Sequence, residues 1–152
     1  MDSVGDSAKG SWEALLNLRN KWKGLVDLQL VALVPLYYWA TGEGKDFAKK
    51  VSSYGGLFGG VVVPPFNQIE CRNNFSELIH LANKLHCPID IHIDESQLEP
   101  AIGLKNLLSV IDTCKPLVPL TCSHCSSMGL LDLPELELLA DNLRENKIDV
   151  IG

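Results

Sequence analysis

The stretch Pro88-Ile-Asp-Ile-His-Ile93 decides how the chain folds, because half of its residues are β-branched and it is too short for a helix. Similar runs recur at intervals of about 30 residues, the length of a βαβ repeat. They are Val26–Val34, Leu57–Val63, Leu117–Cys122 and Ile148–Ile151. Continuous apolar runs, rather than alternating ones, are typical of parallel strands covered on both faces. The sequence therefore predicts a sheet of parallel strands, one for each run.

Helical patterns lie between these runs. Asn74 is placed to cap a helix, with Glu77 three residues later, and Pro134 suits the first position of another helix. Apolar stripes at helical spacing occur over residues 12–22, 47–54, 75–85, 104–111 and 133–143. Strands that alternate with helices predict an α/β fold built around a parallel sheet.

The composition argues against several classes of protein. The formal net charge is −6, so we expect no basic surface for nucleic acid or an anionic membrane. The N-terminus lacks the pattern of a signal peptide, and no apolar stretch reaches the roughly 18 residues of a membrane-spanning helix. Five cysteines without framework spacing indicate reduced thiols. A cytoplasmic protein is the simplest interpretation.

Polar residues gather where two consecutive predicted strands end. His92 lies at the end of one strand, with Asp94 and Glu95 two and three positions later, and His124 closes the next strand. Functional residues of parallel barrels cluster at the carboxyl ends of strands, and neighbouring strands lie about 4.8 Å apart. Neutral imidazole binds Zn²⁺ or Fe²⁺, and a nearby carboxylate moves protons. One histidine would more often be a core residue, but two at consecutive strand ends predict a shared pocket with Glu95.

Two further features allow more than one interpretation. Gln29 interrupts the first apolar run, and a buried amide needs partners that either a pyrimidine edge or a neighbouring polar layer would supply. Tyr37, Tyr38 and Trp39 either shape a pocket or pack a loop.

Two zinc motifs are disfavoured. Cys122 and Cys125 form a C-x-x-C pair, but no second pair stands at zinc-ribbon spacing. The small zinc deaminases do not fit either, because Glu95 is one residue too far from His92 and Thr121 replaces their proline.

The sequence resembles the bacterial-type cytosine deaminases of the amidohydrolase superfamily over essentially its whole length. The resemblance is carried by Val26-Asp-Leu-Gln-Leu-Val-Ala32, Val61-Val-Val-Pro-Pro-Phe66, Ile89-Asp-Ile-His-Ile-Asp-Glu95 and Cys122-Ser-His124. It implies that residues 1–152 form a single partial TIM (β/α)₈ barrel domain with about five parallel βα units, roughly strands three to seven of the barrel.

The same resemblance implies an activity, the metal-dependent hydrolytic deamination of cytosine or a related nitrogen heterocycle. His92 would be a metal ligand, Glu95 the proton shuttle, and His124 the residue that orients a metal-bound water. Gln29 would hydrogen-bond the substrate ring. The cofactor would be one divalent metal ion, Zn²⁺ or Fe²⁺, which lowers the pKa of water for attack on the amidine carbon.

The sequence departs from the family pattern in two ways. No two histidines are separated by one residue, so the H-x-H pair of the first strand is absent, and so is the region with the eighth-strand Asp. Of four expected protein ligands only His92 remains, whereas a catalytic zinc takes three or more. We therefore expect weak or absent metal binding and no activity from this incomplete chain alone.

Two alternatives remain, another amidohydrolase-superfamily hydrolase that acts on cyclic amides, and a non-catalytic binding or assembly module. About five of eight units would also leave two sheet edges, at Val26–Leu33 and Ile148–Ile151, which favours self-association. The side chains expected to face the barrel interior include Val61, Val63, Ile91 and Leu120.

Overall fold

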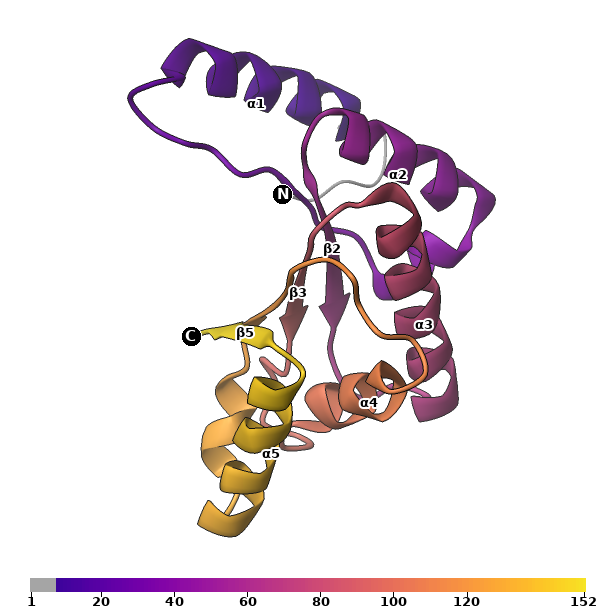
Figure 1. The fold of residues 1–152 in the computed structure, drawn as a ribbon, viewed down its shortest axis with the longest axis vertical. Helices are drawn as coiled ribbons and strands as arrows, with labels where there is room; N and C mark the ends of the chain where they lie inside the picture. The colour runs from indigo at the N-terminus through magenta and orange to yellow at the C-terminus, as the bar shows by residue number, and fades with distance from the viewer. Residues whose placement is uncertain (1–7) are drawn as a thin grey trace.

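The computed structural model describes residues 8–152, and its strands form one parallel sheet (Figure 1). The strands of this region are β1 (Val31–Ala32), β2 (Leu57–Val62), β3 (Ile89–Ile93), β4 (Leu120–His124) and β5 (Ile148–Ile151). They lie in the order β1-β2-β3-β4-β5, and each consecutive pair is parallel. The predicted α/β fold with parallel strands is confirmed.

Helices connect the strands in βα order. They are α1 (Ala8–Trp22), α2 (Gly42–Ser53), α3 (Gln68–Leu85), α4 (Ile102–Ile111) and α5 (Leu133–Glu145), with the 3₁₀ turns η1 (Leu36–Ala40) and η2 (Ser126–Leu130). Figure 1 shows α3 and α4 along one side of the central strands. Within residues 8–152, no helix combines the length and the apolarity needed to cross a membrane.

The start of α3 differs from the prediction. Helix α3 begins at Gln68, because the side chain of Asn67 caps it by accepting the N–H groups of Ile69 and Glu70 at 2.9 and 3.1 Å. The predicted cap, Asn74, lies inside this helix. Pro134 does lie in the first turn of α5, as predicted.

The start of β1 also differs from the prediction. This strand contains only Val31 and Ala32, with one more bridge from Pro35 to Val61. Residues 26–29 precede it, and Val26 is exposed, so the apolar run Val26–Val34 is longer than its paired part.

The two faces of the sheet differ in cover. In β3 and β4, alternate residues pack against the helices in the buried core, and we call them the helix face: Ile89, Ile91, Ile93, Leu120 and Cys122. The residues between them are only half-buried, and we call them the open face: Asp90, His92, Thr121 and Ser123. Ile91 and Leu120 therefore lie on the helix face, and their predicted placement toward the barrel interior is wrong. The helices that follow the strands bury these positions.

Candidate functional site

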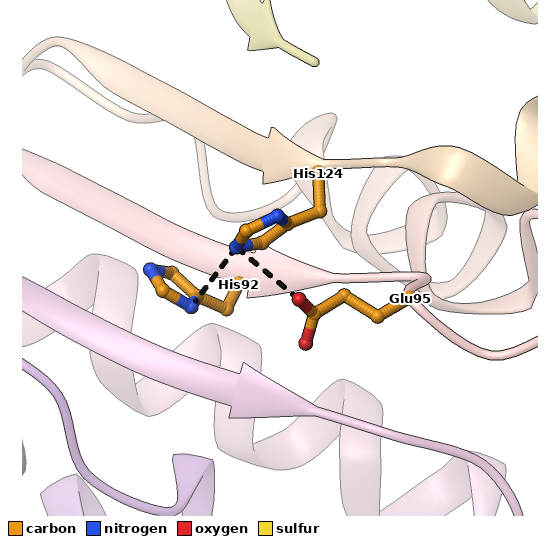
Figure 2. A group of neighbouring side chains, drawn as sticks. All are labelled: His92, Glu95 and His124. Atoms are coloured by element: carbon orange, nitrogen blue, oxygen red, sulfur yellow. Dashed lines mark hydrogen bonds and ion pairs between the residues drawn. The ribbon is translucent and has the colours of Figure 1, made fainter.

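The carboxyl ends of β3 and β4 bring three predicted site residues together (Figure 2). Ile93 and His124 are in register, so the residues near them meet at one edge of the sheet. His92, Glu95 and His124 each place one potential ligand atom within 4.8 Å of the others.

His124 is the centre of this group, which we call the His-Glu-His cluster. Its Nε2 atom is 3.3 Å from Nδ1 of His92 and 3.3 Å from Oε1 of Glu95 (Figure 2). The two imidazole rings are T-shaped, with centroids 4.6 Å apart. The side chains of His124 and Glu95 are 43% and 44% exposed, so a small ligand can reach them. The contact with Glu95 is an ion pair when the His124 ring carries a second proton.

Left-handed backbone conformations create this convergence. Asp94 has φ 58° and His124 has φ 76°, values that cost a non-glycine residue roughly 1–2 kcal/mol. Strict alternation along each strand would place Glu95 and His124 on the helix face. Instead, Asp94 is buried and Glu95 contacts His124, which in turn contacts His92 of the open face. Strained residues of this kind cluster at functional sites.

Asp94 stands apart from the cluster although the sequence places it beside Glu95. Its carboxylate accepts the N–H groups of Gly103 and Leu104, each at 2.8 Å. Burial raises the pKa of the Asp94 carboxyl, while these two N–H groups and the charge of Lys105 act in the opposite direction. The carboxylate therefore faces the start of α4, where it holds the helix.

The structure does not bring Gln29 to the cluster, and its prediction as a residue of the same pocket needs correction. Pro35, shortly after β1, lies level with His92 across the sheet, because Pro35 bridges Val61 and Val61 pairs with His92. Gln29 comes six positions before Pro35, on the order of 20 Å along an extended chain. It is exposed and precedes β1, so its amide lies near the amino end of the sheet.

Sequence reasoning missed a second polar contact on the open face. The hydroxyl of Ser123 donates to Oδ1 of Asp90 at 2.7 Å, across β3 and β4. Asp90 precedes His92 by one full pleat, so this pair lies on the same face as the cluster. The alternation of Asp90 with Ile91 and His92 was the available signal.

A cavity of about 240 Å³ lies at the carboxyl end of β2. Val61, the register partner of His92, forms part of its wall together with Tyr37 and Phe66. Trp39 is instead fully buried, and its indole N–H donates to the Gly59 carbonyl at 2.7 Å. Tyr37 thus lines a pocket, whereas Trp39 packs the core.

Comparisons with known proteins place these features in context. No family model matches the chain. The chain is 29% identical over 133 residues to a pterin deaminase of Rhizobium rhizogenes (strain K84). The aligned region covers 87% of this chain and 30% of that protein.

Two solved structures share its fold. The 5-methylcytosine deaminase from Klebsiella pneumoniae liganded with phosphonocytosine has a TM-score of 0.76 and 22% identity, over 98% of this chain and 36% of that chain. The N-isopropylammelide isopropylaminohydrolase from Burkholderia multivorans has a TM-score of 0.75 and 21% identity, over 91% and 36%. The chain thus spans about a third of the length of the proteins it matches. The predicted fold is confirmed: the chain has the fold of part of these two proteins, and it is similar in sequence to a pterin deaminase.

Proposed function

We propose that the chain carries part of the active site of a metal-dependent amidohydrolase that deaminates cytosine or a related nitrogen heterocycle. The observation that carries the proposal is the convergence of His92, Glu95 and His124 at the carboxyl end of the sheet. Proteins named as deaminases of 5-methylcytosine and of pterin are among those it is similar to. That likeness favours a heterocycle with an exocyclic amino group as the substrate class.

The spacing of the cluster fits a divalent metal ion. Two ligand atoms that each lie 2.0–2.1 Å from a tetrahedral zinc are about 3.3–3.4 Å apart. His124 Nε2 stands at 3.3 Å from both His92 Nδ1 and Glu95 Oε1. Imidazole nitrogen and carboxylate oxygen also suit Zn²⁺ or Fe²⁺ chemically. His92 would hold the ion, with the other two side chains within reach of it.

The remaining chemistry follows from the side chains. A bound divalent ion supplies a Lewis acid that makes water nucleophilic near neutral pH. Glu95 takes a proton from the attacking water and delivers it to a ring nitrogen, and His124 orients that water by a hydrogen bond. The second water proton goes to the exocyclic amino group, the C–N bond breaks, ammonia leaves, and a C=O bond remains on the ring. The cavity wall at Val61 and Tyr37 offers an apolar surface for a flat ring.

The chain by itself should bind metal weakly and show no measurable turnover. It contains no H-x-H pair, so a metal ion would depend on the His-Glu-His cluster alone, in which Glu95 and His124 have other proposed tasks. Ammonia release from cytosine by the purified chain, abolished by Glu95→Gln, would contradict this expectation.

Calorimetric titration with Zn²⁺ tests the proposed site. The chain should bind one ion. His92→Ala removes one of the three potential ligands and should weaken the binding by about a hundredfold. His80→Ala is the matched control, because His80 is exposed on α3 and is not part of the cluster. Equal Zn²⁺ affinity in the chain and in His92→Ala would overturn the proposal.

Self-association through the sheet edges remains part of this proposal. The outermost strands of the described sheet, β1 and β5, each pair on one side only, and Val150 and Ile151 of β5 are 43% and 57% exposed. Sedimentation velocity at micromolar concentration should show dimers or larger species. A monodisperse monomer would contradict this part.

A further inference from the structure

Asp94 caps a helix that does not follow it directly. Its side chain is 1% exposed, and Oδ1 and Oδ2 accept the N–H groups of Gly103 and Leu104. These are the second and third residues of α4, whose N–H groups lack partners within the helix. Ala101, which precedes α4, provides no side-chain cap. The end of β3 therefore supplies the cap for α4.

Both oxygens of Asp94 are used, which distinguishes it from the cap of α3. There, the single Oδ1 atom of Asn67 accepts two N–H groups. In Asp94 each oxygen accepts one N–H group. An asparagine at position 94 would keep the shape of the side chain but direct an NH₂ group at an N–H donor.

The backbone of Asp94 also holds the segment that follows His124. Its carbonyl oxygen accepts the N–H of Ser127 at 3.0 Å and the hydroxyl of Ser126 at 3.3 Å. Ser127 is itself buried, and its hydroxyl oxygen accepts the N–H of Ala101 at 2.9 Å. Asp94 thus connects the end of β3, the start of α4, and η2.

The residues that make these contacts adjoin the His-Glu-His cluster in the chain. Asp94 stands between His92 and Glu95 in the chain, and its left-handed φ of 58° turns Glu95 toward His124. Ser126 and Ser127 lie two and three positions after His124. We propose that Asp94 is a positioning residue: its bonds to α4 and η2 fix the spacing of Glu95 and His92 relative to His124. The inference rests on the proposed function for the metal, but the spacing itself can be measured without metal.

The test compares Asp94→Asn with the unaltered chain by NMR. In metal-free protein, the ring protons of His92 and His124 should give a cross-peak, because the ring centroids are 4.6 Å apart. Asp94→Asn should weaken that cross-peak and shift the ring ¹⁵N signals of both residues, leaving His80 and His86 unchanged. Zn²⁺ affinity should fall by about tenfold or more, as for other residues that orient metal ligands.

Asp132→Asn is the matched control. Asp132 caps α5 by accepting the N–H of Glu135 at 2.9 Å, and it is not part of the cluster. This variant should leave the ring signals and the Zn²⁺ affinity unchanged. A general effect of replacing a capping carboxylate would change both variants alike and would overturn the inference.

Ser127→Ala covers the case in which Asp94→Asn does not fold, as judged by circular dichroism. It removes the acceptor for the Ala101 N–H and should shift the same ring signals by a smaller amount. The decisive variant is Asp94→Asn if it folds, and Ser127→Ala if it does not. Unchanged ring signals of His92 and His124 in that variant would overturn the role of Asp94. If the unaltered chain binds no Zn²⁺, the proposal that these three side chains alone hold the ion fails, and the metal-free ring signals still decide the role of Asp94.

Discussion

The helix face and the open face are made by alternate residues of the same strands. In β3, Ile89, Ile91 and Ile93 are at most 1% exposed, whereas Asp90 and His92 between them are half-buried. Apolar contact with the helices makes the first set a source of stability. The second set pairs with polar neighbours on β4. Stability and chemistry are thus divided between neighbouring positions, so substitutions one residue apart should have different effects.

The largest difference should be seen between Ile91 and His92. Ile91→Ala removes a fully buried side chain from the helix face and should lower the free energy of unfolding by about 2–5 kcal/mol. His92→Ala changes a half-buried residue and should alter it by about 0.5 kcal/mol or less. Urea unfolding of both variants measures the contrast. Equal losses would break the division between the faces.

A smaller loss is expected where α4 meets the helix face. A Cβ atom at Gly103 would lie 2.6 Å from Cγ1 of Ile93 and 2.9 Å from Oδ1 of Asp94. Gly103→Ala should therefore lower the free energy of unfolding by about 1–3 kcal/mol, the usual range for overpacking. Gly129→Ala is the control, because nothing lies within 4 Å of its added Cβ. Thermal unfolding that ranks Gly129→Ala as the more damaging change would argue against tight packing here.

A smaller loss than at Gly103 should come from breaking a hydrogen bond on the open face. Ser123→Ala removes the hydroxyl that donates to Asp90 and should lower the free energy of unfolding by about 0.5–1.5 kcal/mol. Thr121→Val changes a neighbouring open-face residue of similar volume and serves as the comparison. A loss for Ser123→Ala as large as that for Ile91→Ala would mean that the open face also carries the stability of the sheet.

The sequence predicts the order and the parallel direction of the strands because apolar runs at βαβ intervals have few other solutions. It does not predict where pairing starts within a run. Residues 26–34 read as one strand, yet pairing begins at Val31, so Gln29 falls outside it. Hydrophobicity alone does not mark the residue at which a ladder of hydrogen bonds begins.

The turns at the strand ends were equally hidden. Asp and His are enriched among non-glycine residues at positive φ, but most of them have negative φ, so the residue types of Asp94 and His124 do not by themselves predict left-handed turns. The prediction that Glu95 shares a pocket with two histidines rested on proximity in the chain and on the family resemblance. In the structure it depends on a reversal of alternation at Asp94, which the contacts of Asp94 with α4 and η2 maintain.

We propose above all that a divalent metal ion binds at the carboxyl end of the open face. Anomalous diffraction at the zinc absorption edge, from crystals of the chain grown with Zn²⁺, tests it most directly. We expect one peak within bonding distance of His92 Nδ1, near His124 Nε2 and Glu95 Oε1, that disappears in His92→Ala. A zinc peak elsewhere, with none at these three side chains, would contradict it.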